Sequence, residues 1–312
     1  MQINKNKYKN VADFVHELCR LAGIMLYSNR FSKKTYTQIQ HLFLLVYKQF
    51  RKFTYEELLT DLANQRELRN YLGLRKLPHY TTLVKFAQRL PTKVADKLLL
   101  SFKTLIPTPK KVAIDATGIG LDNASSHYCK RIGRVYKRRP FMKTTFVVDI
   151  EHYTILLCKQ RKKERHDTKD AKPLIKKLAR HYHPEILYAD RGYDDNAIFE
   201  LSFETLKAYP LILQKNIFVP KHRKSGAYRK LTCDVFDYGE YLQRNKIETC
   251  NSMFKRRFGA IVQDRTEKTQ KISILLRVIA FNIDRLMRMG KNIILIILRI
   301  TRISYQPRIT NP

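Results

Sequence analysis

Two aspartates stand where charged side chains are uncommon. Asp115 lies inside the apolar run 111–117, and Asp190 ends the apolar run 185–190 directly before an Arg-Gly pair. Carboxylates are disfavoured in strands and are seldom buried without a partner. Each has an ordinary explanation, because Asp115 could pair with a cation and Asp190 could begin a turn. Both also fit ligand binding, since ligands of open α/β sheets bind at the carboxyl ends of strands.

A third acid, Glu248, lies in a stretch (residues 241–255) that contains no Pro or Gly and is predicted to be helical. At about 100° per residue, Tyr241, Arg244, Glu248 and Lys255 fall on one stripe roughly 60° wide. The opposite side should face a core and carries Leu242, Ile247, Cys250, Met253 and Phe254. Glu248 is the single acid among the bases Arg244, Lys246, Lys255, Arg256 and Arg257. Such a carboxylate is either an ion-pair anchor or a metal ligand beside a polyanion.

The three acids together predict a more specific chemistry than any one of them. Carboxylates that converge in a basic groove suit two-metal phosphoryl transfer. Mg²⁺ takes few protein carboxylates and completes its coordination with water and phosphate oxygens. The surrounding bases would supply affinity for the rest of a phosphate backbone. This interpretation requires that Asp115, Asp190 and Glu248 meet within a few ångströms.

The charge balance points to the same class of partner. The chain has 312 residues, 61 Lys and Arg against 27 Asp and Glu, and a net charge of +34. A polyanion most easily offsets such self-repulsion, and nucleic acid is the commonest one. An anionic membrane surface is the weaker alternative. The hydrophobic content of 44% indicates a folded chain with a core.

Several protein classes are excluded by what the sequence lacks. No apolar run approaches the ~20 residues of a membrane span. The five cysteines are scattered and form no Cys-x-x-Cys pair, which indicates reduced thiols and no zinc site. No Gly-x-x-x-x-Gly-Lys loop is present, so no nucleotide cofactor is expected. We expect a cytoplasmic, nucleoid-associated protein without a membrane partner.

The pattern of elements predicts two regions and a tail. Residues 1–106 read as a helical DNA-binding region with a candidate helix-turn-helix at 54–90, although an ordinary helical subdomain fits the pattern equally well. Residues 107–290 read as a mixed α/β domain, and residues 291–312 as a tail or last helix. Helices are predicted at 11–28, 36–53, 168–182, 194–207, 239–258 and 268–289, strands at 111–117, 142–150, 154–158, 185–190 and 211–213, and irregular structure at 218–237.

The motifs resemble one family. DDE transposases of prokaryotic insertion sequences, in the group that includes insertion-sequence families four and five, carry a Tyr-x2-Arg-x3-Glu-x6-Lys signature around the third acid. This chain has Tyr241, Arg244, Glu248 and Lys255 at that spacing. The family's first acid lies in an apolar strand, as Asp115 does, and its second often precedes Arg-Gly-Tyr, as Asp190 does. The resemblance covers about residues 35–290 and implies an RNase H-like sheet flanked by helices.

The resemblance also implies roles. Asp115, Asp190 and Glu248 would be catalytic and would ligate two Mg²⁺ ions, with Mn²⁺ able to substitute. The chain would cut transposon ends at their terminal inverted repeats and join the freed 3′-hydroxyls to target DNA, as a homodimer on DNA. Residues predicted to contact DNA are Tyr241, Arg244, Lys255, Lys246, Arg256 and Arg257. Tyr241 could instead be a tyrosine at the edge of the core, and Arg256 and Arg257 simple solvated charge.

Two further functions stay open on sequence alone. One is an RNase H-like DNA nuclease that cuts without strand transfer. The other is a catalytically inactive DNA-binding derivative of a transposase that uses the basic surface only. The complete set of three acids with its basic neighbours argues against the inactive derivative, and a strand-transfer assay separates the nuclease from a transposase.

Overall fold

A computed structural model describes residues 2–121, 126–133, 140–163, 165–215 and 219–290. The chain forms two compact units. One unit comprises the residues up to Leu90 together with those from Asn282 onward, and the other comprises Pro91–Phe281. The predicted tail at 291–312 lies outside the described residues. None of the helices in the described ranges combines the length and the apolar run that a membrane crossing requires.

The first unit begins with five helices: α1 (Gln2–Leu21), α2 (Gln38–Arg51), α3 (Tyr55–Asn64), α4 (Arg66–Tyr71) and α5 (Tyr80–Arg89). Capping boxes start two of them, because Thr37 and Thr54 each exchange hydrogen bonds with the residue three positions later. The predicted first helix has the wrong bounds. It ends at Leu21 and not at residue 28, because Gly23 adopts a left-handed conformation with φ +63°.

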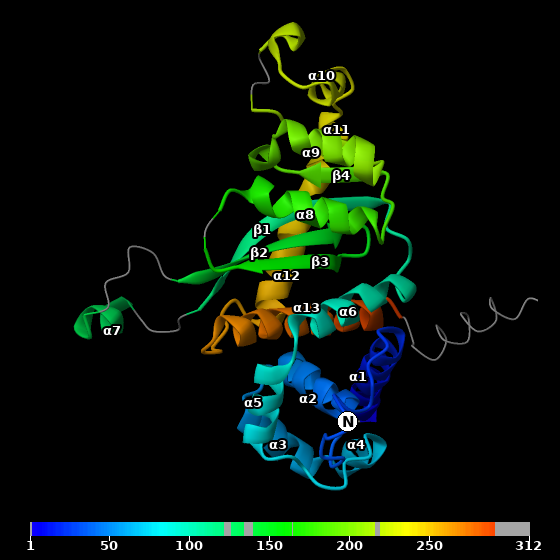
Figure 1. Cartoon of the computed structure of the whole chain (residues 1–312), viewed down its shortest axis with the longest axis vertical. Coiled ribbons are helices and arrows are strands. Elements are labelled where there is room, and N and C mark those ends of the chain that lie inside the picture. The colour runs from blue at the N-terminus through cyan, green and yellow to red at the C-terminus, as the bar shows by residue number, and fades with distance from the viewer. Residues whose placement is uncertain (1, 122–125, 134–139, 164, 216–218, 291–312) are drawn as a thin grey trace, which may run out of the picture. The chain divides into compact units, whose positions relative to one another are not determined.

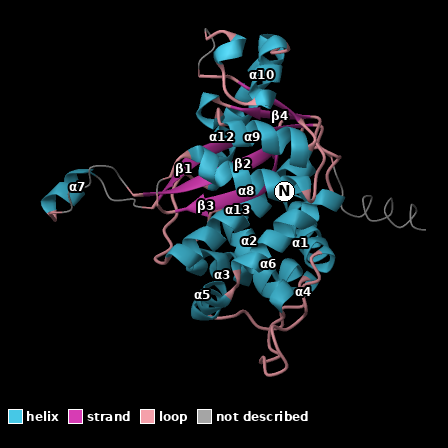
Figure 2. Ribbon diagram, turned by 45° about the horizontal axis from the view of Figure 1, so that its top comes forward, coloured by secondary structure: helices cyan, strands magenta, loops and turns pink. Residues whose placement is uncertain are grey.

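The second unit is built on a five-stranded sheet, shown in Figures 1 and 2. The strand order is β3-β2-β1-β4-β5; β1, β2 and β3 pair antiparallel, and β4 and β5 run parallel to β1. This order and these directions are those of an RNase H-like sheet, as the sequence predicted. The strands are β1 (Lys111–Gly120), β2 (Phe141–Asp149), β3 (Thr154–Arg161), β4 (Ile186–Ala189) and β5 (Tyr209–Ile212).

Helices cover both faces of this sheet. In Figure 1, α8 lies in front of the strands and α12 runs behind them. The remaining elements after the first unit are α6 (Thr92–Ser101), α7 (Ser126–Arg131), α8 (Asp167–Ala179), α9 (Asn196–Glu200), a π-helical turn (Leu201–Leu206), α10 (Ala227–Asp234), α11 (Tyr238–Tyr241), α12 (Asn245–Phe258) and α13 (Glu267–Arg288), with short 3-10 turns at Phe102–Thr104, Arg191–Tyr193, Lys221–Arg223 and Leu242–Arg244.

The structure differs from the predicted elements in two further places. Helix α6 was not predicted, and it joins the sheet unit, so the boundary between compact units follows Leu90 and precedes residue 106. The segment 218–237, predicted to be irregular, contains α10. Its Thr232 is buried and accepts a hydrogen bond from Gln214, so tertiary contacts order a stretch whose high charge suggested a solvated loop. The DNA-binding role of the N-terminal region stays a prediction.

Candidate active site

Two of the predicted acids lie side by side where the parallel pairing of β1 with β4 ends. Ile114 of β1 pairs in register with Ala189 of β4. Asp115 and Asp190 directly follow this last pair, so the same register places them next to each other. Paired residues of parallel strands project to the same face of a sheet. The sheet topology therefore brings together two acids that are 75 residues apart in sequence (190 − 115 = 75).

Asp115 is held in a partly buried setting. One of its carboxylate oxygens, Oδ2, accepts a hydrogen bond from Nδ2 of Asn251 at 2.9 Å. Burial raises the pKa of Asp115 to about 6, and the negative charges of Asp190 and Glu248 act in the same direction. The N–H of Ala116 and the charge of Arg244 oppose this rise. Asp190 and Glu248 therefore both lie within electrostatic reach of Asp115.

Asp190 begins the turn that follows β4. Its Oδ1 accepts a hydrogen bond from the N–H of Gly192 at 2.8 Å, so it caps the short 3-10 turn Arg191–Tyr193. A Cβ at position 192 would lie 2.9 Å from the same oxygen. Glycine is therefore required for the carboxylate to keep this position. The turn-initiating role weighed from sequence is confirmed, and it leaves Oδ2 of Asp190 outside the cap.

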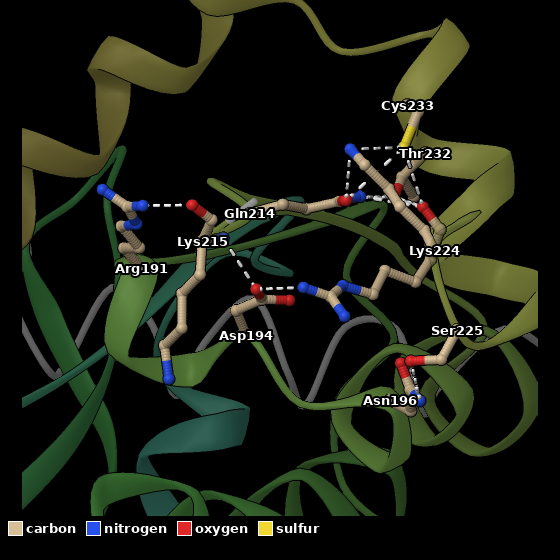
Figure 3. Close-up of polar contacts among 10 residues, drawn as sticks. Arg191, Asp194, Asn196, Gln214, Lys215, Lys224, Ser225, Thr232 and Cys233 are labelled. Carbon is tan, nitrogen blue, oxygen red and sulfur yellow. Dashed lines mark hydrogen bonds and ion pairs between the residues drawn. The ribbon is translucent and has the colours of Figure 1, made fainter. Parts of the chain in front are cut away.

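Figure 3 shows the contacts between the turn after β4 and the basic segment after β5. The guanidinium of Arg191 donates to the carbonyl oxygen of Lys215. The buried carboxylate of Asp194 accepts from the N–H of Lys215 at 2.7 Å and from Arg229 at 2.5 Å. Nearby, the buried ammonium of Lys224 contacts the side chains of Gln214 and Cys233. The loop that carries Asp190 is thereby tied to α10.

The third acid lies on α12, which packs against the sheet. Ile247, Cys250, Phe254 and Phe258 are buried, and the ring of Phe254 lies 5.3 Å from that of Phe146 on β2. Beyond the helix, the chain returns to β1, where Gly120 pairs with Ile261. These contacts fix the C-terminal half of α12 relative to β1 and β2.

The predicted continuous helix over 241–255 is wrong in one respect. A 3-10 turn at Leu242–Arg244 separates α11 from α12. Side chains three residues apart eclipse in a 3-10 turn, so Tyr241 and Arg244 stay on one side, and Arg244 still reaches Glu248 on α12. Leu242, the first residue of this turn, was predicted to face the core, but it is 50% exposed.

Glu248 is more exposed than the two aspartates and is paired with a base. Its Oε1 accepts from Nη2 of Arg244 at 2.7 Å, and its side chain is 58% exposed. Arg244 also interacts with Tyr241, whose pKa is raised mainly by burial. The ion-pair role of Glu248 is therefore observed directly. Tyr241 is buried, which agrees with the alternative of a tyrosine at the edge of the core.

The other bases predicted to contact DNA occupy both ends of α12. Lys246 is half-buried in the first turn. The last turn carries Lys255, Arg256 and Arg257, of which Arg256 is exposed. Cations in this position also complement the negative end of the helix dipole. Their positions therefore serve the helix as well as any DNA contact.

Three other side chains lie close enough together to hold one metal ion. In the described part of the chain, potential ligand atoms of Asp149, Glu151 and His152 all lie within 4.8 Å of one another, and the three predicted acids do not form such a group. Asp149 has a structural role, because its oxygens accept from the N–H groups of Glu151 and His152 and from Nδ1 of His152. This turn lies at the amino end of β1, where Asp149 pairs with Val112.

The donor set around Asp115 nevertheless fits a divalent cation. Carboxylate and amide oxygens are the hard ligands that Mg²⁺ prefers. The raised pKa of Asp115 shows that its charge is poorly compensated by the protein. Oδ1 of Asn251 is buried and accepts no hydrogen bond from the described residues. A cation among these acids would relieve both conditions.

The roles of three residues in and around the site were not predicted from sequence. Asn251 follows Glu248 by three positions and so shares its side of the helix, which is a signal that the spacing could have given. The buried pair of Asp194 and Arg229 had no such signal, because Asp194 was predicted only to start a helix. Asp195 is the residue that caps α9.

A comparison with protein-family models identifies the family of the chain. The model of the transposase DDE domain family matches residues 106–283, more than half of the chain. A cryo-EM structure of the piggyBac transposase synaptic complex with hairpin DNA is similar with a TM-score of 0.45 and 8% identity, over 91% of this chain and 76% of that one. No curated protein sequence matches. The family match, on a sheet that places two acids in register, means that the chain belongs to the transposase DDE domain family.

Proposed function

We propose that the chain cuts phosphodiesters at transposon ends in a metal-dependent reaction and then transfers the 3′-hydroxyl to target DNA. The observation that supports this most is the register that sets Asp115 beside Asp190. Glu248 adds its charge to the same neighbourhood from the opposite element, α12. A site that served structure alone would not gather three acids and leave one with a raised pKa.

Asp115, Asp190 and Glu248 are the residues that would hold the cations, two Mg²⁺ or two Mn²⁺. When bound, a pair of such ions activates the attacking oxygen and stabilises the leaving one. The chain's own part is to hold the two aspartates rigidly through strand register and the Asp190 cap. Glu248 must exchange its contact with Arg244 for the cation, and its exposure leaves it free to do so.

Arg244 is then released to the nucleic acid. A guanidinium binds two phosphate oxygens with its planar fork. Once Glu248 binds the cation, a DNA phosphate competes for Arg244 more strongly than the Glu248 carboxylate does. We assign the same role to Tyr241 and Lys255, with Lys246, Arg256 and Arg257 extending the contact along the backbone. DNA binding is accordingly expected to weaken steeply with salt.

The helices of residues 1–106 are assigned to recognition of the terminal repeats. Within them, α5 carries Lys85 and Arg89 on its exposed side, while Leu83 and Ala87 are buried. An exposed basic helix of a three-helix arrangement is the element that enters a major groove in helix-turn-helix proteins. Substitution of Lys85 and Arg89 by Ala should reduce selection of the element end more than nonspecific binding. Equal losses of affinity for the element end and for nonspecific DNA would refute the assignment. A homodimer that holds both ends stays part of the proposal.

The deciding experiment is nicking of a labelled element end by wild type and Asp115→Asn. Wild type should nick only with Mg²⁺ or Mn²⁺, and the variant should bind the DNA without nicking it. Metal-independent nicking, or nicking by the variant, would overturn the proposal. Strand transfer is scored in the same reaction with a target plasmid. Nicking without joined products would identify a nuclease, and binding without either would identify an inactive derivative.

A further inference from the structure

Asn251 connects the helix of the third acid to the strand of the first. It lies on α12 one turn beyond Glu248 and is 8% exposed. Its Nδ2 donates to Oδ2 of Asp115 at 2.9 Å across 136 residues of sequence. A buried amide that reaches a half-buried carboxylate from a facing element is a specific contact, because both groups have lost water to make it.

The orientation of this amide is fixed by the charge that it faces. The reversed amide would bring Oδ1 of Asn251 against Oδ2 of Asp115, and two acceptors repel. In the observed orientation Nδ2 donates to the aspartate, and Oδ1 is buried without a hydrogen bond from any residue that the structure describes. Buried amide oxygens are nearly always satisfied. Oδ1 therefore requires a donor that the described part of the chain does not provide.

We infer that Asn251 is a positioning residue of the cation site, which orients Asp115 through Nδ2 and accepts a hydrogen bond at Oδ1 from a water of the bound cation. This inference rests on the proposed function. Ligand carboxylates are themselves commonly hydrogen-bonded by residues that orient them. Asn251 acts together with the N–H of Ala116, which also contacts the Asp115 carboxylate. The two donors select one rotamer of Asp115 before the cation arrives.

The test measures cation binding to the full chain. Asn251→Leu keeps the side-chain size and removes both polar atoms. Mn²⁺ binding, followed by the loss of the free-ion paramagnetic resonance signal, should weaken about 10–100-fold, the usual effect of losing such a partner. Ser252→Ala, an exposed neighbour on the same helix, should bind Mn²⁺ like wild type. DNA affinity in EDTA should stay the same in both variants, because it depends on the bases.

Two additions keep the test decisive. Asn251→Ser removes the amide without adding an apolar group, so it should also weaken Mn²⁺ binding even where Asn251→Leu unfolds. In an Asp115→Asn background, Asn251→Leu should cause no further loss, because Asn251 acts through Asp115. If an Asn251 variant melts like wild type in EDTA and binds Mn²⁺ as tightly as Ser252→Ala does, the inference about Asn251 is overturned. The proposed function would still stand. Absence of Mn²⁺ binding by wild type would count against the proposed function itself.

Discussion

The acids of the sheet and the acid of the helix are held in different ways. Asp115 and Asp190 are placed by β1 and β4, and their carboxylates are engaged by N–H groups of Asn251 and Gly192. Glu248 projects from α12, is largely exposed, and is contacted only by the end of a long arginine side chain among the hydrogen bonds of the described residues. The backbone therefore fixes two acids, while the position of the third depends on side-chain contacts that can exchange.

This difference shows that Glu248 is the acid of the site whose side chain can change position. Strand register cannot shift by one residue without turning every buried side chain of β1 to the wrong face. Rotation of Glu248 away from Arg244 costs little, because exposed ion pairs contribute only about 0–1 kcal/mol. The same contrast explains why the three acids are electrostatic neighbours without forming a compact ligand group. The predictions below test the contrast from the largest expected effect to the smallest.

Glu248→Gln should reduce metal-dependent nicking by about 1000-fold or more, because several kcal/mol of transition-state stabilisation would be lost. End binding should change little, since a neutral amide leaves the basic surface intact. Single-turnover nicking and a gel-shift assay in EDTA measure the two quantities. A variant that nicks within tenfold of wild type would show that the two strand-borne aspartates suffice.

Arg244→Ala should reduce nicking by roughly 10–100-fold, the range that a lost charge-assisted hydrogen bond of about 1.5–3 kcal/mol gives. The free energy of unfolding should fall by less than about 1 kcal/mol, because the ion pair with Glu248 is exposed. Denaturant titration and nicking rates are compared with those of Lys246→Ala. A loss of stability without a loss of rate would assign Arg244 a purely structural role.

Asp115→Asn should stabilise the metal-free protein above pH 6. Burial raises the pKa of Asp115 from 3.8 to about 6, so between these values the folded state binds more protons than the unfolded state. Stability from this group therefore falls as pH rises through that window. The variant escapes this loss and should melt roughly 2–4 °C higher at pH 7.5, the shift that about 1 kcal/mol gives in a domain of 150–250 residues.

The same melting experiment in EDTA at pH 4 supplies its control. There wild-type Asp115 is protonated in the folded state, so the two proteins should melt together. Glu248→Gln, which removes an exposed charge, should produce a smaller change at pH 7.5 than Asp115→Asn. An equal gain from both substitutions would mean that the buried and exposed acids are not held differently.

Glu151→Ala should leave nicking within about twofold of wild type, because surface changes away from a site usually have effects within ±0.5 kcal/mol. This residue belongs to the group with Asp149 and His152 that meets the geometric criterion for a metal site. Its turn lies at the opposite end of β1 from Asp115. A large loss of metal-dependent nicking would move the cation site to that turn.

Much of the sheet could be predicted because its strands are short apolar runs bounded by Gly, Pro or charge. The spacing of Tyr241, Arg244, Glu248 and Lys255 indicated the family. The prediction of one continuous helix with Leu242 in the core failed, because a 3-10 turn and an α-helix can share the same residue types and only packing decides between them. α10 escaped because its order comes from contacts such as that of Gln214 with Thr232, which no local pattern contains.

The sequence by itself determined the residue types and their order: three separated acids, a basic signature and an apolar frame for a mixed sheet. Only the tertiary structure decided that Asp115 and Asp190 are adjacent, since register depends on the pairing of strands far apart in the chain. It also decided that Asn251 reaches Asp115 and that Glu248 pairs with Arg244. The physical reason is that burial, hydrogen bonding and charge compensation depend on neighbours in space, which a linear pattern does not specify.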